Sequence, residues 1–421
     1  MRTGSCARTR CRGKCRSTRP AAAGACSSRP ATPSPIPSKG RSGSFFSGAS
    51  GRAESVQGAE GDSMKTLPLA IVILMGLQDP QTKPLAIGDP APDFSLPGVD
   101  GKTYTLADFA SSKLLIVAFT SNHCPTAQAY EERLKKIVAD YKPKGVALVG
   151  IQPNSPKGLR LDELGYTELG DTFEDMKVRA REKEFNFPYV DDGDTQKVSR
   201  AYACKATPHV FLFDEARKLR YAGRIDDSEE PEHVKVSDLR NALDALLEGK
   251  EIAVPLTKTF GCSTKWASKE ESVKKYMEKL AAEPVTVEPV DEAGLAALRR
   301  NGSGKLRLVS FWSPSRAEDL PALVEINRMY RHRAFEMVTV AVGSPGDKDG
   351  VEKALRQAQC SAKNLIVAGQ PAAFDKDAAV PFTTLLNAEG KVLYKAAGRI
   401  DPLELKKSIV NTLGRSIDKK K

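Results

Sequence analysis

One cysteine of this sequence stands where a thiol can do chemistry. Cys124 follows an apolar run, Leu114 to Phe119, and precedes a helical pattern that begins at Thr126. The first N–H groups of a helix lack partners inside it and carry the positive end of its dipole, so a thiolate is favoured there over a thiol. Pro125 suits the first helical position. The pattern predicts a reactive cysteine, although a cysteine without such context is more often a small buried hydrophobe.

Two further side chains lie close to Cys124 in the sequence. His123 could stabilise a thiolate as a cation, but the side chain of an adjacent residue often points away. Ser121 could cap the start of the helix.

The elements that must position Cys124 form a β-α-β unit. Their apolar strands read as continuous runs, which is typical of strands buried on both faces. A polar, partly helical insertion at 152–182 follows the unit. The expected elements are a hairpin at 96–105, strands at 114–119 and 146–151 around a helix at 126–141, an extended piece at 185–191, a helix at 195–202, strands at 207–214 and 219–221, and a helix at 236–247. This succession is the thioredoxin-like architecture.

The same order recurs in the second half of the chain. The expected elements there are strands at 306–312, 337–342 and 365–367 and helices at 317–330 and 351–358. A stretch from Pro208 that ends in Gly-Arg-Ile-Asp has a counterpart that starts at Pro381 and ends in the same four residues. An internal repeat of this kind indicates tandem copies of one domain.

The repeat also offers an internal comparison for the cysteine. When Phe119 is aligned with Phe311, Arg316 stands against Cys124. The second copy therefore lacks a cysteine at the start of its helix. We predict that it is redox-silent and serves as a packing or partner-binding domain.

The predicted fold class is α/β, with two tandem thioredoxin-like domains, each a central mixed β-sheet flanked by helices. The predicted segments are a disordered basic leader (1–63), a signal peptide and linker (64–84), a first thioredoxin-fold domain (85–249), a linker (250–288), a second domain (289–415) and a basic tail (416–421).

The net charge of +11 is concentrated at the start of the chain. Residues 1–63 hold eleven basic and three acidic residues, a net of +8, so the rest of the chain gives no reason to expect nucleic-acid binding. The leader has no apolar periodicity and reads as disordered. Four of the eight cysteines lie in it, without the paired spacing of a zinc site.

A second possible start of translation lies at Met64. Lys65 and an apolar run of eleven residues, Leu67 to Leu77, follow it, which is the pattern of a secretory signal. We therefore predict that translation starts at Met64, so that residues 1–63 come from an over-long gene prediction. We also predict that the protein is exported to a periplasmic or other extracytoplasmic compartment. Without a clean cleavage site, the run at 67–77 could instead remain as a membrane anchor.

The stretch from Phe119 to Thr126 resembles the peroxidatic motif of the peroxiredoxin superfamily, in which a Thr or Ser three residues before the cysteine hydrogen-bonds its sulfur. Gly88 to Phe94 resembles the opening of the alkyl hydroperoxide reductase/thiol-specific antioxidant and redoxin families. The resemblance covers residues 85 to about 265, whereas 290–415 resemble only the general thioredoxin fold. It implies that Cys124 attacks a peroxide, forms a sulfenic acid and returns to the thiol through a disulfide. It also implies that Ser121 orients the thiolate and the peroxide and that His123 assists electrostatically, so both are candidate catalytic residues.

Some positions depart from these families. Val117 replaces the proline seven residues before the cysteine, the activating arginine has no counterpart, and Ala127 stands in place of thioredoxin's second cysteine. Pro208, preceded by Thr207, matches the cis-proline beside thioredoxin-fold active sites; the alternative is an ordinary strand-start proline.

The oxidised cysteine needs a second thiol. Cys262 follows Gly261 after the closing helix and resembles the Gly-Cys element that trails this branch of peroxiredoxin-like proteins. Cys204, four residues before Pro208, is the second candidate, and Cys360 is expected to be structural. A glutathione- or thioredoxin-like donor acting on Cys124 alone is the alternative.

We predict a thiol peroxidase or thiol oxidoreductase that acts on a peroxide or disulfide substrate and is recycled by a thiol reductant protein. His123, Cys124 and His209 could converge, as in copper-delivering thioredoxin-fold proteins, but those use a CxxxC motif and residue 128 is Gln. No metal or other cofactor is predicted. The competing class is a non-enzymatic binding or metal-handling module.

Overall fold

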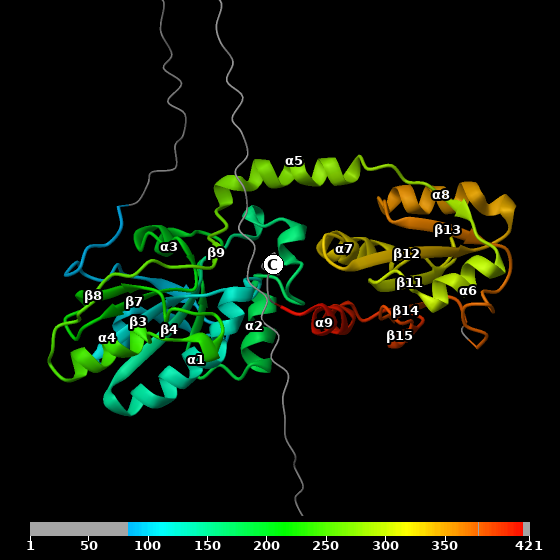
Figure 1. The fold of residues 1–421 in the computed structure, drawn as a ribbon. Helices are drawn as coiled ribbons and strands as arrows, with labels where there is room; N and C mark the ends of the chain where they lie inside the picture. Colours follow the sequence, from blue (N-terminus) through cyan, green and yellow to red (C-terminus); the bar gives the residue numbers. More distant parts are fainter. Residues whose placement is uncertain (1–82, 378, 416–421) are drawn as a thin grey trace, which may run out of the picture. The chain divides into compact units, whose positions relative to one another are not determined.

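The computed structural model describes residues 83–377 and 379–415 (Figure 1). The predicted basic leader, the apolar run at 67–77 and the tail at 416–421 lie outside these residues, as do Cys6, Cys11, Cys15 and Cys26. All described residues belong to one unit of the chain, Leu74–Lys421. The predicted division into two domains at residue 289 therefore stays a prediction.

The central strand of the first sheet leads to the predicted reactive cysteine. Its strands are β3 (Leu114–Phe119), β4 (Val146–Gln152), β5 (Tyr189–Asp191), β7 (His209–Phe213) and β8 (Leu219–Gly223). They lie in the order β5-β4-β3-β7-β8, parallel from β5 to β3 and antiparallel from β3 to β8. All six residues of β3 are buried, which confirms a strand covered on both faces.

Helices cover both faces of this sheet. They are α1 (Pro125–Tyr141), α2 (Phe173–Glu182), α3 (Lys197–Ala201) and α4 (Asp238–Leu247). Ile116 of β3 packs in one core with residues of α1 and α4. Val117, its neighbour in sequence, packs in the other core with α3. The alternation follows from the two-residue period of a strand.

Two short antiparallel pairs flank the sheet. They are β1 (Ser95–Pro97) with β2 (Thr103–Thr105), and β6 (Ala206–Thr207) with β9 (Cys262–Ser263). The first pair confirms the expected hairpin. The second lies partly in the segment predicted as a linker, 250–288, which also contains α5 (Glu270–Ala281). That segment is therefore not a simple connection, since β9 completes a strand pair next to Cys124.

A second sheet repeats the strand order of the first. Its strands are β10 (Glu288–Pro289), β11 (Leu306–Trp312), β12 (Phe335–Val342), β13 (Lys363–Val367), β14 (Phe382–Leu386) and β15 (Val392–Ala397). They lie in the order β10-β13-β12-β11-β14-β15. Its helices are α6 (Glu292–Arg300), α7 (Leu320–Tyr330), α8 (Lys348–Gln357) and α9 (Pro402–Leu413).

The residue registers of the two sheets also correspond. Phe119 pairs with His209 in the first sheet, and Phe311 pairs with Phe382 in the second. His209 and Phe382 each follow a proline whose peptide bond is cis, Pro208 and Pro381. The alignment of Phe119 with Phe311 is thus matched by the strand pairing.

The second half also differs from expectation at the start of its first long helix. The helix α7 begins at Leu320 and not at Ala317, because Arg316 closes a turn onto Ser313 and Pro321 suits the first helical turn. Arg316 therefore does not occupy the helix start that Cys124 occupies. The helix α6 was not predicted, although Asp291, which caps it, gave a recognisable signal.

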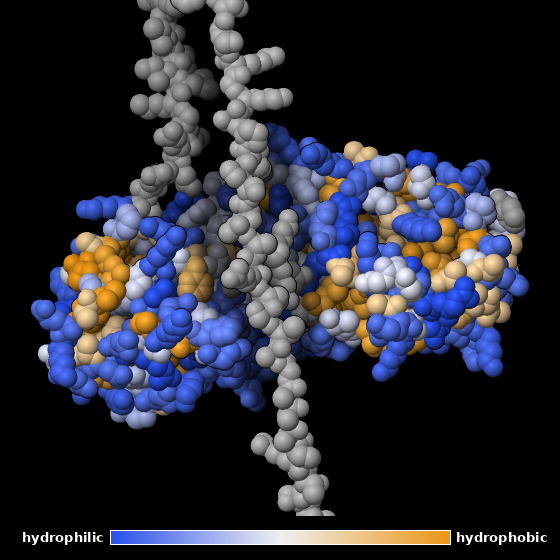
Figure 2. Space-filling view, in the orientation of Figure 1, coloured by the Kyte–Doolittle hydropathy of each residue, from blue (hydrophilic) through white to orange (hydrophobic). Residues whose placement is uncertain are grey.

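The outer surface gives little indication of function. Figure 2 shows hydrophilic residues over most of one face, with apolar patches between them. No helix among residues 83–377 and 379–415 is long and apolar enough to cross a membrane. The chemistry of the protein must be sought in its buried polar groups.

Candidate active site

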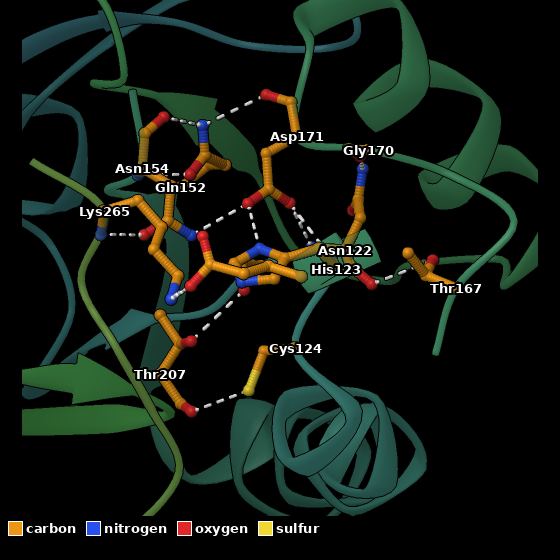
Figure 3. A network of polar contacts seen from close by, with 12 residues as sticks. Asn122, His123, Cys124, Gln152, Asn154, Thr167, Gly170, Asp171, Thr207 and Lys265 are labelled. Atoms are coloured by element: carbon orange, nitrogen blue, oxygen red, sulfur yellow. Dashed lines mark hydrogen bonds and ion pairs between the residues drawn. The ribbon is translucent and has the colours of Figure 1, made fainter. Parts of the chain in front are cut away.

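Cys124 is the N-terminal cap of α1 and is fully buried. The backbone N–H of Ala127 donates to its sulfur at 3.4 Å, and the thiol lies 3.1 Å from the carbonyl oxygen of Thr207 (Figure 3). Burial by itself would raise the pKa of Cys124. Hydrogen bonding from the Cys262 side chain, the charge of His123 and hydrogen bonds from Thr207 and Ala127 together lower that pKa to about 6. The site therefore favours the thiolate near neutral pH.

His123 does not point away into solvent. Its ring is buried, and Nδ1 lies 2.5 Å from Oδ2 of Asp171. Burial would lower the pKa of His123, but the charge and hydrogen bond of Asp171, together with the charge of Cys124, raise it above its ordinary value. Asp171 and Cys124 thus both favour the charged form of this imidazole.

Ser121 does not cap α1. Its hydroxyl lies 3.2 Å from that of Thr207, and it is Cys124 that caps α1. Thr207, directly before the cis peptide bond of Pro208, contacts the Ser121 hydroxyl with its own hydroxyl and the sulfur of Cys124 with its carbonyl oxygen. The role of Ser121 in orienting the sulfur stays a prediction.

Cys262 lies beside Cys124. It pairs with Thr207 in the two-stranded β6–β9 sheet, so the chain segment that carries it crosses the residue that contacts the Cys124 sulfur. The interaction with Cys124, followed by burial, raises the pKa of Cys262 far above its ordinary value, which keeps it a thiol that can donate to a Cys124 thiolate. Both cysteines are unpaired thiols in the structure.

Gly261 allows the close approach of this segment. Its φ is +131°, and an alanine Cβ there would lie 2.1 Å from the carbonyl oxygen of Thr207. We expect Gly261→Ala to displace β9 and to slow formation of a Cys124–Cys262 disulfide by roughly 10²-fold, the loss that a misplacement of about 1 Å can cause. Non-reducing peptide mapping after brief peroxide treatment measures this rate.

Gly249→Ala is the matched control. Gly249 also has a positive φ, +70°, but no atom lies within 4 Å of the added Cβ. The Gly249→Ala substitution should lower the free energy of unfolding by about 1 kcal/mol and leave the rate of disulfide formation unchanged. Equal rates in the two variants would show that the close approach at Thr207 does not control the position of Cys262.

The other described cysteines lie in different surroundings. The Cys204 sulfur contacts the carbonyl oxygen of Ala206 at 3.5 Å and the hydroxyl of Thr264 at 3.6 Å, and burial raises its pKa to about 12. The Cys360 thiol donates to Asn364, and burial raises its pKa to about 11. The contacts of these two thiols are those of buried structural cysteines.

His209 does not join His123 and Cys124. Its ring packs 4.3 Å from that of Phe211, between centroids, and burial lowers its pKa to about 3. It lines a different cavity of about 280 Å³ together with Tyr202 and Lys205. No group of three metal-ligating side chains was found within residues 83–377 and 379–415.

The sequence did not reveal three polar residues of the site. Asp171 and Asn154 come from the loops after β4, and Lys265 follows β9. The Asn154 amide donates to Oδ2 of Asp171 at 2.8 Å, and its oxygen accepts from the backbone N–H of Lys265 at 2.8 Å. These residues are far apart in sequence and belong to no short motif, so only the folded chain brings them together.

The comparisons with known proteins address the same part of the chain. The sequence profile of the AhpC/TSA family matches residues 87–222. This part of the chain is a peroxiredoxin-like domain of the thioredoxin fold. Peroxiredoxin Bcp of Escherichia coli (strain K12) is 34% identical over 99 residues, which are 23% of this chain and 62% of that protein. A peroxiredoxin-named protein of Mycobacterium tuberculosis (strain H37Rv) is 29% identical over 146 residues, 31% of this chain and 93% of its own length.

Two solved structures are also similar to this peroxiredoxin-like chain. A hypothetical protein from Sinorhizobium meliloti 1021 is 36% identical, covers 44% of this chain and 97% of its own, and has a TM-score of 0.39. An uncharacterized conserved protein from Geobacillus kaustophilus is 37% identical, covers 43% of this chain and 92% of its own, and has the same TM-score, 0.39. The family membership supports a thiol-based redox function for the chain.

The site differs from the peroxiredoxin pattern at Val117 and in its positive charges. Val117 is a fully buried residue of β3 that pairs with Val149 and Phe211. In place of an activating arginine, the charge of His123 lowers the pKa of Cys124, and the charge of Lys265 opposes the rise in the pKa of Cys262. The peroxiredoxin-like site thus has its own arrangement of positive charge.

Proposed function

We propose that the protein is a peroxiredoxin-type thiol peroxidase in which Cys124 is the nucleophile and Cys262 the resolving thiol. The observation that carries this proposal is geometric: Cys124 caps the start of α1, its thiol contacts the carbonyl oxygen of Thr207, and Cys262 pairs with Thr207 in the neighbouring strand pair. A thiolate and a protonated thiol side by side are what attack and resolution require.

The reaction has two balanced steps. The Cys124 thiolate attacks one oxygen of a peroxide, the O–O bond breaks, and the sulfur is oxidised to a sulfenic acid while the other oxygen leaves and takes up a proton. The sulfur of Cys262 then attacks the sulfenic acid, a disulfide forms, and water leaves. A thiol reductant protein returns both cysteines to thiols by disulfide exchange.

The test of this function is peroxide treatment followed by mass mapping of all cysteines. We expect one equivalent of hydrogen peroxide to produce a Cys124–Cys262 disulfide, with Cys204 and Cys360 left as thiols because burial raises their pKa values. Unchanged Cys124 after this treatment would contradict the peroxidase function.

Thiol–disulfide exchange is the second candidate function. It rests on the same pair of neighbouring thiols, since a Cys124–Cys262 pair can exchange with a substrate disulfide without any peroxide. A pair that is oxidised by a disulfide such as oxidised glutathione, but not by hydrogen peroxide, would favour it. Inertness to both oxidants would favour a non-enzymatic binding module.

Further parts of the proposal concern the rest of the chain. We propose that residues 289–415 form a second, redox-silent thioredoxin-like domain that binds a protein partner; this is supported by the repeated strand order and by the burial of Cys360. We also propose that the apolar run at 67–77 directs export of the protein. Fractionation of cells that produce the native protein tests this, and a protein confined to the cytoplasm would contradict it.

A further inference from the structure

Asp171 is a buried carboxylate whose partners all favour its charged form. Its Oδ1 accepts the backbone N–H groups of Asn122 at 2.8 Å and His123 at 3.0 Å, and its Oδ2 contacts the His123 ring and the Asn154 amide (Figure 3). Burial would raise the pKa of Asp171, but the charge and hydrogen bonds of His123 lower it below its ordinary value. An acceptor with donors on every side stays ionised.

The other nitrogen of the His123 ring has no such partner. Nε2 is buried and has no hydrogen-bond partner among the described residues, and His123 as a whole is only 1% exposed. A buried polar atom without a partner is costly, unless a group that arrives during the reaction uses it. Figure 3 shows Asp171 on one side of the ring and Cys124 beyond the other.

We propose that Asp171 is a positioning residue: through Nδ1 it holds His123 as an imidazolium whose free Nε2–H faces the reacting sulfur and stabilises the Cys124 thiolate. In the proposed peroxidase reaction, which this step presupposes, Nε2 then gives its proton to the oxygen that leaves when the O–O bond breaks. The leaving oxygen departs as water or an alcohol, and the neutral imidazole regains a proton from solvent.

The charged groups that face His123 come from several elements. They are Asp171 from the loop before α2, Cys124 at the start of α1 and Lys265 after β9. Lys265 opposes the imidazolium, but its Nζ is paired with Glu163 at 2.6 Å. Asp171 is thus the charge that keeps the ring protonated. Without it, the pKa of His123 falls, the thiolate loses its cation and the pKa of Cys124 rises.

The experiment is a pH titration of thiolate ultraviolet absorbance in the full chain, with Cys124→Ser subtracted as the blank. The wild-type midpoint should lie near pH 6. In Asp171→Asn, which keeps the size of the side chain, the midpoint should rise by roughly one unit or more, because one opposite charge is removed. Oxidation by hydrogen peroxide at pH 7 should slow by about tenfold, and alkaline pH should restore the thiolate but not the proton donor.

Asp226→Asn is the matched control. Asp226 is also a buried carboxylate, in the loop after β8, but it accepts from Tyr130 at 2.6 Å and from Arg133 at 2.7 Å, further along α1. Its loss should leave the midpoint of Cys124 unchanged. A folded Asp171→Asn variant with the wild-type midpoint would overturn the proposal.

A measurement on the wild type covers the case in which Asp171→Asn does not fold. The imidazole ¹⁵N signals of His123 should show both nitrogens protonated at and above pH 6.5, the ordinary pKa of histidine. A neutral His123 ring at that pH would overturn the proposal. If the wild type shows an imidazolium and a low thiolate midpoint but no reaction with peroxide, the peroxidase function fails while the role of Asp171 in holding the thiolate stands.

Discussion

Replacing Cys124 by serine is expected to abolish peroxide consumption. A serine hydroxyl does not ionise near neutral pH and cannot form the sulfenic acid, so the rate should fall to the uncatalysed background. Because enzymes commonly exceed that background by about 10⁶-fold or more, we expect a loss of at least about 10³-fold. A coupled assay of peroxide loss with a dithiol reductant measures it.

Two sets of controls make this result specific. Cys204→Ser and Cys360→Ser should keep the activity, because their sulfurs bond to Thr264 and Asn364 and not to Cys124. Cys262→Ser should still consume one equivalent of peroxide and accumulate sulfenic acid at Cys124, and excess peroxide should oxidise this to sulfinic acid with a second equivalent. Activity that survives in Cys124→Ser would move the chemistry to another residue.

Replacing Arg179 by methionine is expected to destabilise the fold by about 3–5 kcal/mol, the cost of leaving a buried charge without its partner. Arg179 is 1% exposed and binds Glu131 of α1 at 2.7 and 3.0 Å and Glu168 at 3.1 Å. Burial raises the pKa of Glu131, and Arg179 opposes that rise. Urea unfolding at pH 7 measures the loss.

The pH dependence of this loss follows from the same carboxyl group. Without Arg179, the pKa of Glu131 should rise further, and below that pKa the protonated side chain no longer needs a cation. The loss of stability should therefore shrink as the pH falls. Arg181→Met, an exposed position on the same helix α2, should change stability by less than about 0.5 kcal/mol. A similar small change in Arg179→Met would mean that the ion pair does not stabilise the fold.

Much of the first sheet could be predicted because local pattern and burial agree. The strand at 114–119 and the helix at 126–141 were predicted within one residue, since β3 is a continuous apolar run and Pro125 marks the start of α1. The start of α7 was placed three residues too early, because the turn closed by Arg316 onto Ser313 depends on a backbone hydrogen bond and not on a residue pattern.

The candidate site divides in the same way. The sequence by itself determined which cysteine caps a helix, and it named Cys262 as the preferred partner, because a helix start and a Gly-Cys element are local features. Only the tertiary structure decided the rest. Asp171 meets His123 across 48 residues, and Cys262 meets Thr207 through a strand pair that no local pattern announces. Local sequence sets backbone geometry, whereas the charges that lower the pKa of Cys124 come from segments that only burial brings together.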